Sequence, residues 1–497
     1  MLEKILKFSI HQRWMILIAS LGIAALGVYN FQRLPIDAVP DITNIQVQIN
    51  TEAPGYSPLE TEQRITYIVE TAMFGLTKLK EIRSISKYGL SQVTVIFHDG
   101  TDIYFARQLI NERIQSVKAQ LPSSIEPMMG PIVTGLGEIF MWTVETKANT
   151  PKSYTSTELR TIQDWVIRPQ LLTVPGVAEI NAIGGYVKQF HVTPYPDKLK
   201  EYGITFKDLL RALSENNDNV GAGYIEHKGE QYLIRAPGQV KTLEEIRWIR
   251  LGSYNGTPVY IKHVADVVLG KELRTGAATK NGQETVLGTV MMLTGENTRT
   301  VAKSVAEKMK QVNESLPEGV VAKTVYDRTV LVNATIDTVE KNLMEGAILV
   351  IVILFLFLGN IRAAFITALV IPISMLFAMT GMVNNEISGN LLSLGAIDFG
   401  IIVDGAVIIV ENCISRLAEA QKESGRVLSR SERMNIVFEA SREVRKATMF
   451  GELIITIVYL PILTLTGIEG KMFYPMAFTV IAALLGAMIL SMTFVPA

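Results

Sequence analysis

Residues 395–412 read GAIDFGIIVDGAVIIVEN, an apolar stretch that nevertheless carries Asp398, Asp404 and, at its far end, Glu411. On insertion scales a charged residue at mid-bilayer costs about 2.5–3.5 kcal/mol, so such residues are rare and usually functional. At about 100° per residue, Asp398 and Asp404 lie about 120° apart around a helix, whereas Asp404 and Glu411 nearly share a face. We therefore predict that all three carboxylates occupy one broad inward-facing sector.

A proton relay is the function that these acids suggest. Asp404 falls near the middle of the stretch, where a low dielectric favours the neutral carboxyl and a nearby cation favours the carboxylate. Small movements would then load and unload a proton. The alternative is that the acids are structural groups bonded to neighbouring helices, and Glu411 also fits a solvated position at the membrane interface. Two other acids, Glu345 and Glu452, lie close enough to helix ends to reach that interface.

The rest of the chain also indicates a membrane protein. Of its 497 residues, 48% are hydrophobic and only 19% charged, and the mean hydropathy is +0.26. Six stretches are apolar enough to cross a bilayer, which takes about 20 residues and fewer for a short helix. None of the six contains Lys or Arg, so the acids either stay protonated or take a cation from elsewhere. The six stretches are 14–31, 343–358, 363–383, 391–410, 447–466 and 472–497.

Several classes of site are disfavoured. The charges nearly balance, at 47 basic and 48 acidic residues, which gives no support for nucleic-acid binding. One cysteine rules out an intrachain disulfide and a cysteine metal cluster. The five histidines show no ligand spacing. We find no phosphate-binding glycine loop, nucleophile elbow or metal-hydrolase helix, so no enzyme activity and no cofactor are expected.

The basic residues set the orientation. Lys4, Lys7 and Arg13 precede the first span, which lacks a cleavage site and reads as an uncleaved signal anchor. Eight further basic residues lie within 412–446. The positive-inside rule puts both segments in the cytoplasm and residues 32–342 outside, which in a bacterium is the periplasm.

The external region reads as strands alternating with helices. Residues 44–51 alternate like a strand, and Ser57 with Glu60 forms a capping box that opens a helix to about Phe74. Strands near 81–88 and 90–98 follow, and then a helix within 99–122. The order is βαββα, and residues 138–146 start another strand.

This pattern recurs. LKEIRSIS (79–86) is echoed by VAEINAIG (177–184), and SVKAQLPSSI (116–125) by QVNESLPEGV (311–320). The echoes favour two split-βαβ subdomains. Residues 185–270 do not fit the second repeat and are predicted to form an insertion.

Six segments together resemble the first half of a resistance–nodulation–division (RND) efflux pump of the heavy-metal branch, the CusA/CzcA family. They cover the chain from end to end, and DFGIIVDGAVIIVEN separates the metal branch from the multidrug pumps. The segments are LPIDAVPDIT (34–43), DGTDIYFARQLINERI (99–114), GPIVTGLGEIF (130–140), YDRTVLVNATIDTVEKNL (326–343), GAIDFGIIVDGAVIIVEN (395–412) and FGELIITIVYLPILTLTGIEGKMFYPMA (450–477).

The resemblance implies an α+β membrane protein, in which a six-helix half-bundle carries a large periplasmic insertion of two ferredoxin-like porter subdomains and a docking insertion. Family members are roughly twice as long, so we expect a further half with the basic partner of the acids. The implied division is 1–31 (first helix), 32–134 (first porter subdomain), 135–184 with 271–334 (second), 185–270 (docking), 335–411 (helices two to four), 412–446 (cytoplasmic loop) and 447–497 (helices five and six).

The implied function is an inner-membrane, proton-driven exporter of heavy-metal cations. It would be a trimer in the lipid bilayer and would work with a periplasmic adaptor and an outer-membrane channel. Asp398, Asp404 and Glu411 match the family's proton-relay carboxylates. Efflux of organic amphiphiles, and a non-transporting scaffold that docks adaptors, remain as alternatives.

The metal itself is not identified by any cluster of residues. Met128–Met129 and Met291–Met292 would suit Cu(I) or Ag(I), but methionine more often fills cores. The segment TGLGEIFMWTVE is more similar to the zinc, cobalt and cadmium branch than to the copper branch.

Overall fold

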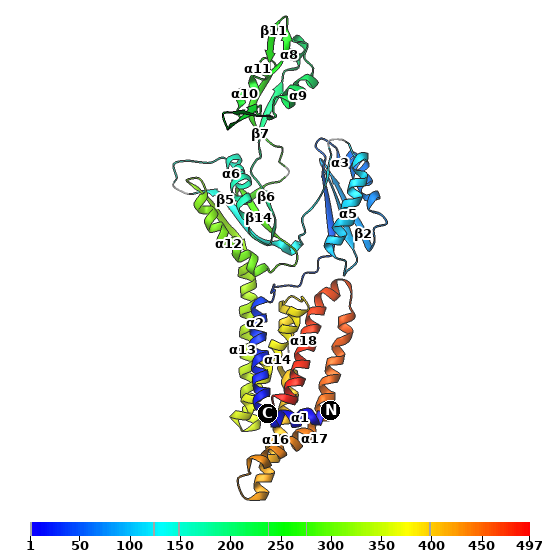
Figure 1. The fold of residues 1–497 in the computed structure, drawn as a ribbon, viewed down its shortest axis with the longest axis vertical. Helices are drawn as coiled ribbons and strands as arrows, with labels where there is room; N and C mark the ends of the chain where they lie inside the picture. Colours follow the sequence, from blue (N-terminus) through cyan, green and yellow to red (C-terminus); the bar gives the residue numbers. More distant parts are fainter. Residues whose placement is uncertain (1, 123–124, 148–149, 237, 275, 397–398) are drawn as a thin grey trace.

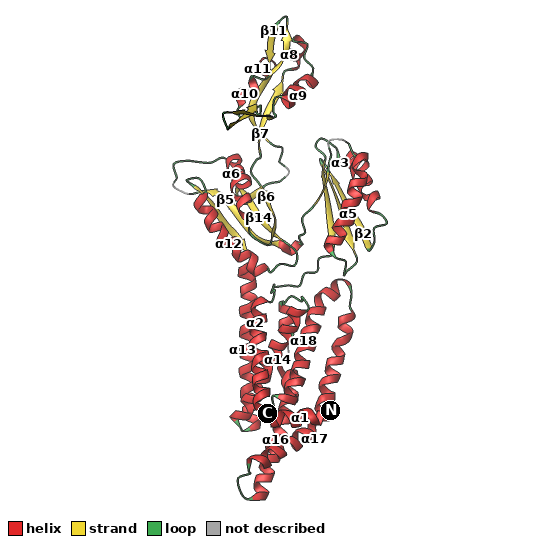
Figure 2. Ribbon diagram, viewed as in Figure 1, coloured by secondary structure: helices red, strands yellow, loops and turns green. Residues whose placement is uncertain are grey.

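The computed structural model describes residues 2–122, 125–147, 150–236, 238–274, 276–396 and 399–497. The molecule is elongated (Figure 1). A bundle of long helices forms one end, two α/β units stand side by side above it, and a third unit lies at the far end. Figure 2 shows that the strands are confined to these three units and that the bundle is wholly helical.

The first α/β unit contains a four-stranded antiparallel sheet in the order β2–β3–β1–β4. The central strand β3 lies between two strands that a helical segment connects, which is the arrangement of a split βαβ unit. Ser57 and Glu60 form both halves of the predicted capping box. The elements are β1 (Gln46–Glu52), α3 (Pro58–Thr61), η1 (Glu62–Thr66), α4 (Tyr67–Met73), β2 (Leu79–Lys87), β3 (Leu90–Phe97), α5 (Ile103–Val117), η2 (Lys118–Gln120) and β4 (Pro127–Met129).

The second α/β unit repeats this order as β6–β14–β5–β15. The echoed sequences fall in equivalent elements: one pair in β2 and β6, the other where α5 and α12 end. A π-helical turn interrupts the first helix of both units. The elements are η3 (Gly135–Gly137), β5 (Glu138–Thr146), α6 (Ser156–Ile162), η4 (Gln163–Ile167), α7 (Arg168–Leu171), β6 (Val177–Ile183), β13 (Ala278–Lys280), β14 (Gln283–Met292), α12 (Thr298–Ser315) and β15 (Val320–Asp327).

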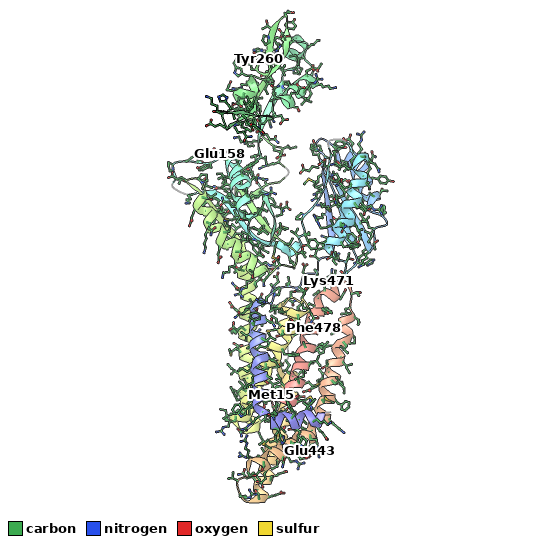
Figure 3. All side chains as sticks on the ribbon, viewed as in Figure 1. Met15, Glu158, Tyr260, Glu443, Lys471 and Phe478 are labelled. Carbon is green, nitrogen blue, oxygen red and sulfur yellow. The ribbon has the colours of Figure 1, made fainter. Side chains whose placement is uncertain are left out.

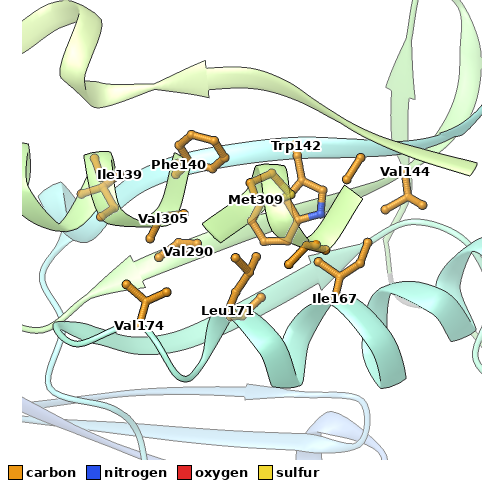
Figure 4. Close-up of a cluster of buried hydrophobic side chains, with 14 of the residues drawn as sticks. Ile139, Phe140, Trp142, Val144, Ile167, Leu171, Val174, Val290, Val305 and Met309 are labelled. Carbon is orange, nitrogen blue, oxygen red and sulfur yellow. The ribbon is translucent and has the colours of Figure 1, made fainter. Parts of the chain in front are cut away.

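Trp142 lies at the centre of the core of the second unit (Figure 4). The side chain is fully buried, and its indole Nε1 donates to Gln163 Oε1 at 2.9 Å. This bond satisfies the one polar atom of the ring, so the burial of a large aromatic surface carries no unpaired donor.

The third unit, here called the distal unit, is entered through β7 and left through β12, which pair antiparallel. It has its own apolar core, which includes Leu209, Ile246 and Val264. The elements are β7 (Lys188–Pro194), α8 (Pro196–Glu201), α9 (Phe206–Glu215), β8 (Val220–His227), β9 (Glu230–Ala236), α10 (Leu243–Arg247), β10 (Arg250–Tyr254), β11 (Thr257–Tyr260), α11 (Ile261–Val264) and β12 (Ala265–Lys271).

Among the described residues, five stretches hold helices that are long and apolar enough to cross a membrane: 13–33, 361–384, 391–424 apart from 397–398, 430–464 and 467–493. The predicted span 343–358 is not among them. It forms the end of α13, a helix that continues from β15 and whose first half carries Asp337, Glu340 and Lys341. The helices are α1 (Leu2–His11), α2 (Arg13–Arg33), α13 (Arg328–Leu358), α14 (Ile361–Asn384), α15 (Leu391–Gly395), α16 (Phe399–Ser424), α17 (Arg430–Tyr459), η5 (Leu460–Thr464) and α18 (Gly467–Thr493).

Segment 412–446 is helical except for residues 425–429, because α16 and α17 both extend into it. Asn412 Nδ2 donates to the Ala440 carbonyl at 2.8 Å. Arg416 pairs with Glu443 at 2.7 Å, and Figure 3 places Glu443 at the end of the bundle away from the α/β units. These contacts fix the antiparallel register of α16 and α17.

Candidate functional site

The predicted relay acids lie on α16. Asp398 is outside the described residues. Asp404 and Glu411 are both exposed in this chain, whereas Ile402 and Ile409 of the same helix are buried. Within this chain the two carboxylates therefore lie on the surface of the helix bundle, and the predicted inward-facing sector is taken by isoleucines.

Helix α17 has the reverse of the usual amphipathic pattern. Its exposed side chains include Leu453, Ile454, Ile457 and Val458, and a polar stripe faces the other helices. Residues spaced by three or four positions share one face of a helix. A helix with apolar side chains outside and polar side chains inside fits a lipid environment. Polar groups that face lipid find no water to bond with, so they are better placed against other helices. The buried polar residues of this stripe are Ser441, Arg445, Thr448, Glu452 and Thr456.

Glu452 packs directly on Gly405, the neighbour of Asp404. A Cβ atom at residue 405 would overlap the carboxylate oxygen Oε1 of Glu452, so a side chain at 405 would force the acid to shift. Glu452 is 7% exposed, and its Oε2 has no hydrogen-bond partner among the described residues. The interpretation of Glu452 as an acid that reaches the interface is wrong. Glu345, by contrast, is exposed and lies 3.8 Å from Lys341.

Arg445 is a buried cation that the sequence analysis missed. Its side chain is 2% exposed, and Nη1 donates to Ser491 Oγ of α18 at 2.9 Å. Nε has no partner within the described parts of the chain. Both Arg445 and Asp404 lie within electrostatic range of Glu452. The predicted span begins at residue 447, two positions too late to include this arginine, which is a basic neighbour of the buried Glu452.

Among the residues that the structure describes, two ion pairs connect the bundle to the α/β units. Asp37 follows α2 and pairs with Arg328, the first residue of α13, at 2.9 Å. The same carboxylate accepts from Thr298 Oγ1 of α12 at 3.1 Å. The Asp37 amide donates to the Gly389 carbonyl, in the turn between α14 and α15, at 3.0 Å.

The second pair joins Lys471 of α18 to Asp99, just before α5 of the first unit, at 2.9 Å. Lys471 Nζ also donates to the Thr43 carbonyl at 2.8 Å. The ammonium group holds the pKa of Asp99 below its usual value. Figure 3 shows Lys471 at the end of the bundle that faces the α/β units.

The described residues contain no group of three or more His, Cys, Asp or Glu side chains that could hold a metal ion. Of the methionines considered as soft ligands, Met292 is buried in the core of the second unit and Met129 packs against the core of the first. Met128 is 68% exposed. The core interpretation is confirmed for Met129 and Met292 and is wrong for Met128.

Comparison with known proteins identifies the family. Residues 5–497 match the AcrB/AcrD/AcrF family. Over its whole length the chain is 64% identical to the cobalt-zinc-cadmium resistance protein CzcA of Cupriavidus metallidurans and 36% identical to the cation efflux system protein CusA of Escherichia coli. The matches cover 47% and 48% of those proteins, so the chain spans about half the length of these relatives.

A solved heavy-metal efflux pump has the same fold. The two structures superpose with a TM-score of 0.86 at 33% identity, and the match covers 99% of this chain and 48% of the pump. This chain therefore belongs to the AcrB/AcrD/AcrF family of RND transporters, in the heavy-metal branch that includes CzcA and CusA.

Proposed function

We propose that this chain is part of a proton-driven exporter of divalent metal cations in the bacterial inner membrane. The observation that carries the proposal is Asp404, a carboxylate in the apolar helix α16 of a chain that belongs to a transporter family. A carboxylate at membrane depth is costly unless it binds a proton or a cation, and proton relays use such residues.

Asp398, Asp404 and Glu411 form the proposed proton path. Asp404 and Glu411 lie seven residues apart on one helix, so they project from nearly the same face. Both are exposed in this chain. We propose that this face packs against the remainder of a longer transporter, which supplies a basic partner.

The proposed cargo is zinc, cobalt or cadmium rather than copper or silver. The support is the higher identity to CzcA, a cobalt-zinc-cadmium resistance protein by its name, than to CusA. The metal is substrate here, and we assign no residue to it.

The proposed assembly is a trimer that works with a periplasmic adaptor and an outer-membrane channel. The first α/β unit (within 32–134) and the second (135–184 and 271–334) would be the porter subdomains, on the periplasmic side. The distal unit, within 185–270, would dock towards the channel. Its support is its position at the end of the molecule farthest from the bundle, together with its separate core.

The test introduces Asp404→Asn at the native chromosomal locus and measures metal resistance and zinc-dependent proton movement in everted membrane vesicles. Asn keeps the shape and removes the titrating group, so we expect at least a tenfold loss of transport. Asp337→Asn, at an exposed position in the first half of α13, is the matched control and should transport normally. Normal metal resistance in the Asp404→Asn strain would refute the relay. Export of organic dyes without any export of zinc, cobalt or cadmium would favour the multidrug alternative.

A further inference from the structure

Two side chains of α17 leave polar atoms unpaired in the interior of the bundle. Glu452 Oε2 and Arg445 Nε have no hydrogen-bond partner among the described residues, although both side chains are more than nine-tenths buried. An unpaired polar group in the interior destabilises a protein, and more so when the group is charged. Neutral side chains of similar size would avoid this cost, so these two groups call for a functional explanation.

The packing of α16 and α17 places the buried acid beside the predicted proton path. Gly405 follows Asp404 directly, and the Glu452 carboxylate fills the space in which a side chain at 405 would lie. The register is held by the Asn412 and Arg416 contacts to α17, closer to the cytoplasmic ends of both helices. Glu452 is therefore held in place by packing against the helix that carries Asp404.

The charged groups around Glu452 are few. Arg445 lies two helical turns away on α17, at about 1.5 Å of rise per residue, and Asp404 is the neighbour of Gly405, the residue of α16 on which Glu452 packs. From α18, Ser491 and the Met488 carbonyl contact Arg445. Glu469 and Lys471 lie at the opposite end of α18. Helix α1 also packs on α17, and its described charged residues are Glu3, Lys4, Lys7 and His11.

We infer that Glu452 is a second proton-carrying carboxyl, which exchanges a proton with Asp404, and that Arg445 is a positioning residue that stabilises the Glu452 carboxylate. The inference rests on the proposed function and deepens it. In the exchange, the O–H bond of the Asp404 acid breaks and an O–H bond forms on the Glu452 carboxylate. The pair keeps one proton and one negative charge throughout, so no other reactant is needed.

This role explains the unpaired Oε2 of Glu452. A carboxyl that changes its protonation state must tolerate a neutral form, which burial favours, and an ionised form, which a nearby cation favours. A fixed hydrogen bond to Oε2 would favour one form over the other. Arg445, anchored to α18 by Ser491, supplies the cation at a distance and leaves Oε2 free to accept a proton.

Infrared titration tests the inference without any need for transport. The protonated carboxyl band of the lipid-reconstituted protein is followed against pH in the wild type, Glu452→Gln and Asp404→Asn. We expect a titrating band that is absent from Glu452→Gln and whose pH profile changes in Asp404→Asn, because coupled acids titrate as a pair. Two results would overturn the inference even where metal transport is normal. One is a Glu452 band that does not titrate, and the other is a Glu452 band whose pH profile is the same in the wild type and in Asp404→Asn.

Transport measurements give the second arm. Glu452→Gln should lower zinc-dependent proton movement at least tenfold and change the shape of its pH profile, and Glu452→Asp should restore part of it. Because both acids act in one path, the Asp404→Asn/Glu452→Gln double variant should be no slower than the slower single variant. Glu345→Gln is the matched control. A loss in Glu452→Gln that is equal at every pH would show a structural role. Titration of Glu452 coupled to Asp404 in a protein without zinc-driven proton movement would leave the inference intact and refute the proposed function.

Discussion

Asp37 accepts hydrogen bonds from two nitrogens of Arg328, Nη2 at 2.9 Å and Nε at 3.2 Å, across 291 residues of sequence. The pair joins the segment that leaves α2 to the point where β15 becomes α13. Thr298 of α12 donates to the same carboxylate. The Asp37 side chain therefore connects the segment after α2 to both α12 and α13. If the second α/β unit moves relative to α2, either this ion pair breaks or the segment that holds Asp37 moves with the unit.

Asp37→Ala should destabilise the junction strongly. The side chains of Arg328 and Asp37 are only 9% and 20% exposed, and removal of one partner from a buried pair costs about 3–5 kcal/mol. We expect faster hydrogen exchange in β15 and the first turns of α13. Thr298→Val keeps the ion pair and is the matched control. Unchanged exchange in Asp37→Ala would show that the pair does not hold the junction.

The Lys471–Asp99 pair should make stability depend on pH. The folded-state pKa of Asp99 lies below the ordinary value of 3.8. The contribution is therefore fully present above pH 3.8 and is lost as the pH falls through the folded-state pKa. Asp99 is 42% exposed, so the contribution is less than about 1 kcal/mol.

The measurement is the Tm from pH 7 down to pH 3. Asp99→Asn should have the lower Tm at pH 7, and its difference from the wild type should narrow as the pH falls below 3.8. Lys471→Met should show the same trend, with an added pH-independent loss from the Thr43 bond. Parallel curves for wild type and Asp99→Asn would contradict the prediction.

Local patterns were sufficient for most of the fold. The Ser57–Glu60 capping box depends on four consecutive residues, and the structure has it at the predicted position. The echoed strands 79–86 and 177–184 fall in β2 and β6, which hold equivalent places in their sheets. Such features depend on residues that are close together in the sequence, so they can be predicted from the sequence alone.

The polar stripe of α17 was missed because hydropathy searches stop at charged residues. Arg445 lies outside the predicted span 447–466, yet it is buried. Its Nη1 bonds to Ser491, which lies 46 residues further along the chain. The spacing of Ser441, Arg445, Thr448 and Glu452 by four, three and four residues was the available signal. The exposure of Asp404 also could not be predicted from the sequence. Periodicity shows which residues share a face of a helix, but it does not show which other helices cover that face.

Gly288→Ala should disrupt the core of the second α/β unit. A Cβ atom at this position would overlap the indole ring of Trp142, which is fully buried and fixed by Gln163. Overpacking of this kind costs about 1–3 kcal/mol. We expect increased hydrogen exchange in β5 and β14. Gly252→Ala in the distal unit, where a Cβ meets nothing within 4 Å, is the control and should leave exchange unchanged. Equal protection in both variants would contradict the packing described for Trp142.

Gly405→Ala should impair proton coupling although it removes no charge. The added methyl would displace the Glu452 carboxylate from its place beside Asp404, so the two acids would no longer be held together. We expect at least a tenfold loss of zinc-dependent proton movement in vesicles. Gly451→Ala is the matched control, since it adds the same methyl to α17 in open space and gains about 1 kcal/mol of helix propensity. If Gly405→Ala moved protons as fast as Gly451→Ala, the contact between Glu452 and α16 would have no part in transport.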